Sequence, residues 1–366
     1  MKITFLIGNG FDVSMGIESS YSKFYEWYYK RPSILKHIRD FKLNIQKDMR
    51  QDIPDEEKTW ADFEVGLGKY TAEFPPALAS QFLDCYDDAQ GGIVEYLKGQ
   101  EEKCDVDAIS DDSLNAFADT ILNFYQELPD LERIAVNSVC NGIQNESREI
   151  SFVSFNYTGI LGEILKRLPS TTLKTWRNGN VEYTCTFNPN IIHVHGTISE
   201  FPIIGVDADG QIVNKELLAT PQFREIMIKA ESVNALGRLW HRQAEELISQ
   251  SRIVCVFGMS LGETDAKWWR KLAQWLKADG NRHVVIYWYD RNPPNGVSVR
   301  KQLEGKNRVI EKLLSYSQLT DKEKDTVRSR IHVIINTSKF LKIPKSEIIK
   351  QESEDIAPVR DGALAL

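Results

Sequence analysis

The hydrophobic pattern changes twice along the chain. It opens with a short apolar run at residues 3–7 that leads into Gly8, Asn9 and Gly10, which predicts a buried strand followed by a tight turn. Between residues 20 and 147 the apolar positions recur instead at spacings of three and four, as at Leu114 and Phe117, and this spacing is typical of helices. We therefore expect a large helical insertion after the first strand.

Strand patterns return in the second part of the chain. They are runs rich in β-branched and aromatic residues, at 150–155, 191–195, 202–206, 253–257, 283–289 and 331–335. Runs without regular alternation are typical of strands buried on both faces of a parallel sheet. Together with the helical stretches between several of them, they predict an α/β fold with a doubly wound, mostly parallel sheet.

The same pattern divides the chain into two parts. Residues 1–345 are predicted to form a single α/β domain, interrupted by the helical insertion at 20–147. Residues 346–366 are charged and end in small side chains, so we expect a C-terminal tail that is free to move.

Composition narrows the classes of function. The chain carries 45 Lys and Arg against 52 Asp and Glu, a net charge of −7, which gives no electrostatic basis for general binding to nucleic acid or to an acidic membrane. No apolar stretch approaches the ~20 residues of a membrane span, and the N-terminus lacks a leader pattern, so a cytoplasmic location is expected. The five cysteines include no CxxC pair, and neither a disulfide framework nor a structural metal is expected.

Polar or glycine-rich segments follow four of the predicted strands, at residues 8–12, 156–158, 195–196 and 258–265. In an open α/β sheet, ligands bind outside the carboxyl ends of the strands. We therefore expect these four segments to form one crevice.

The first two segments have simpler interpretations as well. The first turn lacks the third glycine of a GxGxxG dinucleotide fingerprint, which Val13 replaces, and it would then only make a turn. Asn156 is of a type favoured as a helix N-cap.

The later segments also have alternatives. His193 and His195 would share one face of a strand, but no third metal ligand has a matching spacing. Residues 258–262 have the glycines and serine of a GxSxG nucleophile elbow, yet the predicted helix begins too late for one, and Thr264 is a candidate cap for that helix.

Taken together, the motifs resemble those of the bacteriophage abortive-infection AbiH family, namely IGNGFD, FNYT, HxHG and GxSLGETD, here at residues 7–12, 155–158, 193–196 and 258–265. They are also similar, in the same order, to the GAGxSxxxGIP, QN, HG and GTSL motifs of the sirtuin nucleotide-binding domain. The chain departs from sirtuins at Asn9, Asp12, Glu18 and Thr158, and it has no set of four zinc cysteines. The resemblance thus implies a sirtuin-like NAD site without the acyl-lysine machinery.

The resemblance implies an anti-phage effector that cleaves NAD to nicotinamide and ADP-ribose, an NAD(P)+ glycohydrolase. The leaving pyridinium becomes neutral and needs no general acid, so a base and a water-orienting group suffice. The resemblance assigns these roles to His195, with a pKa near neutrality, and to Asn156. The first turn and its helix N-terminus would cradle the pyrophosphate, and Ser260 with Glu263 or Asp265 would hold the adenosine ribose. The implied NAD-binding residues are Gly8, Asn9, Gly10, Phe11, Asp12, Tyr157, Gly196, Gly258, Met259, Ser260, Leu261, Glu263 and Asp265.

Three other functions stay open at this point. The crevice would also suit a sensor that binds NAD, ADP-ribose or a cyclic signal without turnover, or an ADP-ribosyltransferase. A metal-dependent nuclease would require Asp12, Glu263 and Asp265 to meet around one ion. Because NAD depletion would kill the host, we expect control by a phage trigger, a partner protein or homo-oligomerisation. Residues 60–64 of the insertion either close over the crevice or pack an aromatic side chain onto the core.

Overall fold

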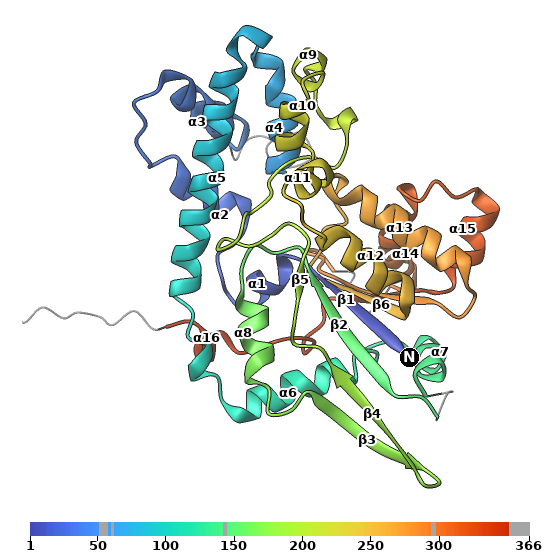
Figure 1. The fold of residues 1–366 in the computed structure, drawn as a ribbon. Coiled ribbons are helices and arrows are strands. Elements are labelled where there is room, and N and C mark those ends of the chain that lie inside the picture. Colours follow the sequence, from blue (N-terminus) through green and yellow to red (C-terminus); the bar gives the residue numbers. More distant parts are fainter. Residues whose placement is uncertain (51–57, 60–61, 142–144, 294–297, 351–366) are drawn as a thin grey trace, which may run out of the picture.

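The computed structural model describes residues 1–50, 58–59, 62–141, 145–293 and 298–350 (Figure 1). The predicted tail at 346–366 therefore lies largely outside the described residues. No helix in the described part combines the length and the apolar character needed to cross a bilayer.

The protein has a mixed α/β fold. Its centre is a β-sheet of mostly parallel strands. Its order is β3-β4-β2-β1-β6-β7-β8, with the short β5 paired to β2. All pairs are parallel except the β3–β4 hairpin. The strands are β1 (Lys2–Ile7), β2 (Arg148–Ser154), β3 (Thr172–Asn178), β4 (Val181–Phe187), β5 (Ile192–His193), β6 (Ser251–Phe257), β7 (His283–Trp288) and β8 (Ile331–Ile335).

Helices cover both faces of this sheet. In β1, Phe5 and Ile7 belong to a hydrophobic cluster with helices within residues 111–141 and 160–167, whereas Leu6 belongs to a cluster on the other face with helices within residues 240–250, 266–278 and 299–328. The helices after β2 are α8 (Ile160–Arg167), α9 (Lys215–Leu218), α10 (Pro221–Met227), α11 (Lys229–Ala235), α12 (Trp240–Gln250), α13 (Ala266–Ala278), α14 (Val299–Ser315), α15 (Asp321–Arg328) and α16 (Lys345–Ile348).

The chain between β1 and β2 is helical in its described residues, and its helices pack in two places. The helices are α1 (Gly10–Ser14), α2 (Tyr21–Tyr28), α3 (Lys36–Asp48), α4 (Phe63–Tyr70), α5 (Ala79–Glu102), α6 (Asp111–Leu122) and α7 (Asp130–Asn141). α6 and α7 join the core of the sheet, whereas α2–α5 share a separate aromatic cluster with residues from 204 to 228. We call α2–α5 and α9–α11 the helical lobe, and Figure 1 shows it above the carboxyl ends of the central strands.

Three strand predictions need correction. Residues 202–206 are not a strand, because their backbone bonds to other partners: Ile203 N–H donates to His195, and Ile204 C=O accepts from the Tyr86 hydroxyl. The predicted strand at 191–195 is only Ile192–His193. The β3–β4 hairpin was not predicted, although Gly179, with a φ of +59°, marks its turn.

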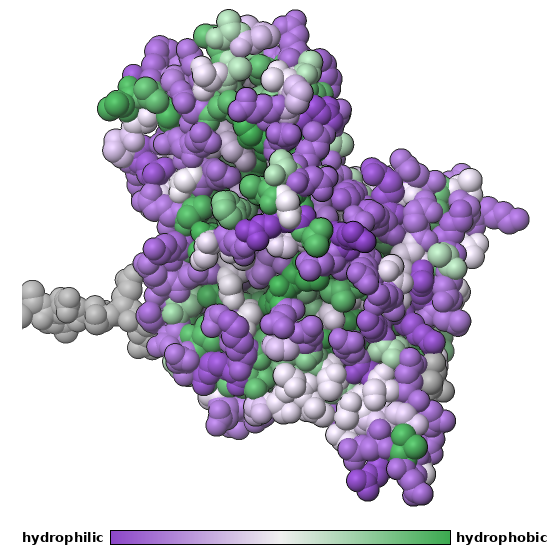
Figure 2. Space-filling view, viewed as in Figure 1, coloured by the Kyte–Doolittle hydropathy of each residue, from purple (hydrophilic) through white to green (hydrophobic). Residues whose placement is uncertain are grey.

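The outer surface is mainly hydrophilic in the view of Figure 2, with small hydrophobic groups between the polar residues. The outline narrows where the helical lobe meets the sheet (Figure 2). The pocket described next lies at this junction.

Candidate functional site

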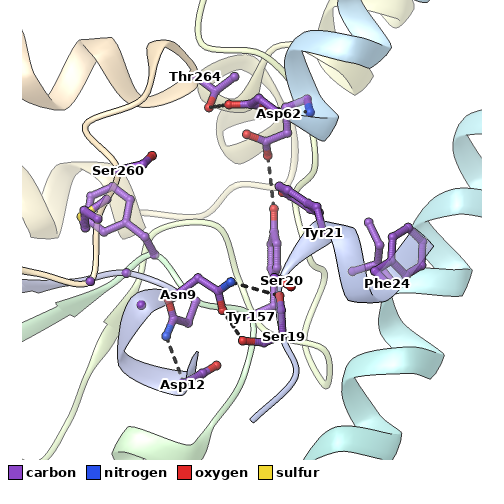
Figure 3. Close-up of a pocket in the computed structure, with 18 of the residues that line it drawn as sticks. Asn9, Asp12, Ser19, Ser20, Tyr21, Phe24, Asp62, Tyr157, Ser260 and Thr264 are labelled. Atoms are coloured by element: carbon purple, nitrogen blue, oxygen red, sulfur yellow. Dashed lines mark hydrogen bonds between the residues drawn. The ribbon is translucent and has the colours of Figure 1, made fainter. Parts of the chain in front are cut away.

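A pocket of about 550 Å³ lies at the carboxyl ends of β1, β2, β5 and β6, on the side of the sheet where an α/β fold binds ligands. This volume is in the range of small-molecule and cofactor sites. Figure 3 shows Asn9, Asp12 and Ser260 from the strand exits and Asp62 and Phe24 from the helical lobe around it. The pocket thus has one wall from the sheet and one from the lobe.

The four strand exits do meet in this pocket. All but four of the residues expected at the NAD site line it. Phe11 and Leu261 are instead fully buried in the hydrophobic clusters on the two faces of the sheet. Glu263 is exposed. Gly196, with a φ of +71°, turns the chain after His195 where a Cβ would lie 2.3 Å from the Phe201 oxygen.

Packing of the backbone, rather than phosphate binding, explains why glycines stand in the first turn. A Cβ on Gly8 would lie 2.7 Å from the Gly258 oxygen, and one on Gly10 would lie 2.6 Å from the Gly258 Cα. The glycines therefore let the exits of β1 and β6 cross in backbone contact. The amides of Gly8, Gly10 and Phe11 already donate to Phe257, Gly258 and Gly8, so they are not the unpaired donors that we expected to cradle a pyrophosphate.

The side chain of Asn9 also forms hydrogen bonds within the protein. Its amide nitrogen donates to the Ser19 carbonyl at 3.0 Å, and its side-chain oxygen accepts from the Ser19 hydroxyl at 2.5 Å. These bonds, drawn in Figure 3, join the first turn to the start of the helical lobe.

Asp12 organises the exit of β2. Its two carboxylate oxygens accept hydrogen bonds from the Asn156 amide at 3.2 Å and from the Thr158 hydroxyl at 2.6 Å. Burial raises the pKa of Asp12 to about 7, although these hydrogen bonds act in the opposite direction. Asp12 therefore fixes the orientation of the Asn156 side chain.

Asn156 is not a helix cap in the structure, because α8 begins at Ile160 and its N-cap is Gly159. With its nitrogen bound to Asp12, Asn156 keeps its side-chain oxygen without a partner, although that atom is buried. Thr264 does not cap α13 either; its hydroxyl donates to Asp62. An orphaned buried acceptor is costly without a ligand or water, so the Asn156 oxygen is a candidate contact for a ligand.

His195 is the second such group. Only 4% of it is exposed, and its Nε2 has no hydrogen-bond partner, while the backbone of Phe155 bonds to the ring. Burial, together with Lys229, His241 and Lys267, lowers the pKa of His195 well below its ordinary value. This shift moves the pKa of His195 away from the value near neutrality that we expected, and the imidazole is neutral at pH 7.

The helical lobe contributes charged groups that the sequence analysis did not assign. Lys229 of α11 forms an ion pair with Glu64 of α4 at 2.6 Å, and its nitrogen lies 3.5 Å from Asp265. Asp62 caps α4 through the amides of Glu64 and Val65. The sequence around Lys229 could not have predicted this ion pair, because the partner residues Glu64 and Asp265 are distant in sequence.

Only part of the 60–64 segment can be compared with its two alternative interpretations. Residues 60–61 lie outside the described residues. Phe63 is fully buried in the aromatic cluster of the lobe, as the packing interpretation predicts, while Asp62 and Glu64 line the pocket.

The carboxylates required for the nuclease alternative do not meet. Glu263 is exposed and does not line the pocket that contains Asp12 and Asp265. Within the described ranges, no group of three or more His, Cys, Asp or Glu side chains is arranged to hold a metal ion.

The fold and the pocket define an α/β protein with a polar, partly charged pocket at the carboxyl ends of the parallel strands of its sheet. The family model described as bacteriophage abortive infection AbiH matches residues 4–287, which include the sheet exits and the helical lobe. The chain belongs to this family, which associates it with abortive infection by bacteriophage. No curated protein matches the chain.

Proposed function

We propose that the protein cleaves NAD to nicotinamide and ADP-ribose as the effector step of abortive infection. The observation that carries this proposal is the pair of orphaned polar atoms, His195 Nε2 and Asn156 Oδ1, both buried and both on residues that line one pocket. An enzyme that acts on a ribose needs a proton acceptor and an acceptor for a hydroxyl or water in one place.

A sirtuin-like, doubly wound core is part of the proposal. It is supported by the parallel order of β2, β1, β6, β7 and β8, by helices on both faces of the sheet, and by the order of the four motifs at the strand exits. In this fold class the crevice lies where strand order reverses, and here the chain passes from β1 to β2 on one side and to β6 on the other.

The neighbours of His195 and Asn156 give each a definite chemical role. The backbone of Phe155 bonds to the ring of His195 while Nε2 has no hydrogen-bond partner, so in this proposal Nε2 carries the lone pair and accepts a proton from a ribose hydroxyl or a water. Because Asp12 holds the nitrogen of Asn156, the Asn156 oxygen faces the ligand and accepts a hydrogen bond from that ribose or water.

The charge of the pocket suits the cationic half of NAD. The carboxyl groups of Asp62, Glu64 and Asp265 line it together with the ammonium of Lys229. Carboxylates stabilise both the pyridinium ring and the oxocarbenium-like sugar formed as nicotinamide departs. Lys58 and Arg291 also line the pocket and bring positive charge for the diphosphate. Ser260 lines it too and would hold the adenosine ribose.

The test is incubation of purified wild type, His195→Ala and Asn156→Ala with NAD, with nicotinamide and ADP-ribose followed by chromatography. Loss of a general base costs roughly 10²- to 10⁴-fold, so His195→Ala should release almost no nicotinamide. His37→Ala is the matched control, because His37 lies on α3, pairs with Asp84 and does not line the pocket. Full activity in His195→Ala would refute the assignment.

A second candidate is a sensor that binds NAD or a related nucleotide without turnover. The low pKa of His195 favours it, because a weakly basic imidazole is a poor proton acceptor. Calorimetric binding of NAD to wild type, with no nicotinamide released over hours, would identify the sensor.

A further inference from the structure

Three charged side chains from three parts of the chain meet beside His195. Lys229 Nζ lies 2.6 Å from Glu64 Oε2 and 3.5 Å from Asp265 Oδ1, and it donates to the Thr264 carbonyl at 3.1 Å. The side chains of Lys229 and Glu64 are 4% and 6% exposed, and that of Asp265 is 18% exposed. We call this group the Glu64–Lys229–Asp265 triad.

The triad is one positive charge short of neutrality when both carboxyl groups are ionised. Burial raises the pKa of Glu64 to about 7 against the effect of Lys229, and it raises the pKa of Asp265 as well. Burial acts to lower the pKa of Lys229, but Asp265 and Glu64 outweigh it, so the ammonium stays charged. An uncompensated buried charge is strongly unfavourable, and the triad is therefore completed by one more proton or by a cation next to it.

His195 stands where that cation would be. Its Nε2 lies 3.5 Å from Asp265 Oδ1, the same oxygen that faces Lys229. The other charged or titratable groups that act on the ring are Lys229, Lys267 and His241, whose ring centroid is 6.4 Å away, and all three disfavour the imidazolium. Asp265 is thus the anionic group in contact with the ring.

We propose that the Glu64–Lys229–Asp265 triad is the counter-charge of His195, with Asp265 stabilising the imidazolium and Lys229 and Glu64 acting as positioning residues for Asp265. As far as turnover is concerned, this inference rests on the proposed NAD cleavage. In that step the O–H bond of a ribose hydroxyl or water breaks, its electron pair stays on oxygen, and the proton bonds to Nε2. The helical lobe therefore sets the basicity of a histidine that belongs to the sheet.

The direct test measures protonation of His195 by ¹⁵N NMR of histidine-labelled protein across pH, with the signal assigned by His195→Gln. Asp265→Asn should move the midpoint to lower pH by about one pH unit, because an opposite charge at this distance favours the charged form. The double variant Glu64→Gln/Lys229→Met should move it to higher pH by a similar amount, because Asp265 then faces His195 without the competing ammonium. This pair of substitutions removes both members of the Glu64–Lys229 ion pair and leaves Asp265 with His195 as its neighbouring cation when the imidazole is protonated.

Lys271→Met is the control, because Lys271 pairs with Glu245 and does not line the pocket; it should leave the midpoint unchanged. A merely structural triad would lower the thermal midpoint in both test variants and leave the His195 titration where it is in wild type. That result, or shifts in the same direction in both variants, would overturn the proposal.

The activity measurement separates the two proposals. If wild type cleaves NAD, Asp265→Asn should lower kcat by up to about tenfold, since a change of one pH unit in basicity corresponds to a tenfold equilibrium effect. If wild type releases no nicotinamide, the proposed function fails, while opposite shifts of the His195 midpoint would still establish the counter-charge. Unshifted midpoints in an active enzyme would reject the triad alone.

Discussion

The sheet core and the helical lobe meet at one pocket but are built differently. The core packs strand side chains against helices on both faces, with aliphatic residues such as Leu6 and Val254 on one face and aromatic residues such as Phe5 and Phe152 on the other. The lobe is held together by aromatic rings, such as Phe82 between Phe74 and Phe223, with ring centroids 5.5 Å apart in both pairs. The core brings Asn156, His195 and the carboxyl groups of Asp12 and Asp265 to the pocket, and the lobe adds the charged side chains of Glu64 and Lys229.

The two regions also fix their pocket residues by different means. The strand exits of the core are locked by backbone contact at Gly8, Gly10 and Gly258, which leaves no freedom without unfolding. The lobe reaches the core through side chains, with Asp62 bonded to Thr264 and Lys229 to Asp265. The geometry of Asn156 and His195 therefore depends on the fold, whereas their electrostatic surroundings depend on how the lobe is docked.

The largest expected loss of stability comes from a substitution in the core, Gly258→Ala. Gly258 has a φ of +71°, and a Cβ there would lie 2.5 Å from the Phe11 nitrogen and 2.7 Å from the Gly8 oxygen. Backbone strain and a clash with backbone on two sides should together cost about 4–6 kcal/mol for Gly258→Ala. Urea unfolding followed by circular dichroism measures this, and a variant as stable as wild type would show that the strand exits are not locked.

The next largest loss of stability is expected from a substitution in the helical lobe. Phe82→Ala should lower the free energy of unfolding by about 3–5 kcal/mol, because Phe82 is fully buried in the aromatic cluster. In hydrogen exchange the loss of protection should appear first in α3 and α5, while amides of β1 and β6 keep theirs. Equal loss in both regions would mean that lobe and core unfold as one unit.

Where the core and the lobe meet, the stability of the protein should depend on pH. The pKa of Asp12 is about 7 in the folded protein and close to its ordinary value of about 4 when unfolded. The native state then binds more protons between these values, so stability should fall as pH rises from about 4 to about 7 and stay level above that. The part that belongs to Asp12 is roughly 4 kcal/mol at most.

Asp12→Asn should reduce that slope in urea titrations at pH 5 to 8. Part of it should remain, because burial also raises the pKa of Glu64 to about 7. An unchanged slope would mean that Asp12 is ionised in the native state at pH 5.

The smallest effect is a gain. Gly91 lies within α5, and no heavy atom lies within 4 Å of a Cβ built there. Gly91→Ala should raise the free energy of unfolding by about 0.5–1 kcal/mol through helix propensity. Compared with Gly258→Ala, it separates a glycine that the fold requires from one that it only tolerates.

Much of the fold follows from local pattern. The strands β1, β2, β6, β7 and β8 and the helical region after β1 were predicted from spacing and composition, because strands buried on both faces are continuously apolar. The error at 202–206 arose because the same composition also suits a buried connecting segment. Its backbone bonds go to His195, Tyr86 and the lobe, and no local signal reveals such partners.

The sequence by itself determined which strand exits meet in one pocket, because Asn156, His195 and the glycines stand directly after apolar runs whose ends converge in any parallel sheet. Only the tertiary structure decided that Asp12 orients Asn156, that the glycines serve a backbone crossing, and that Lys229, Glu64 and Asp265 meet beside His195. The physical reason is the separation along the sequence of the residues that interact. Strand and helix patterns arise between neighbours in sequence, whereas burial, ion pairing and the resulting pKa shifts depend on groups that folding alone brings together.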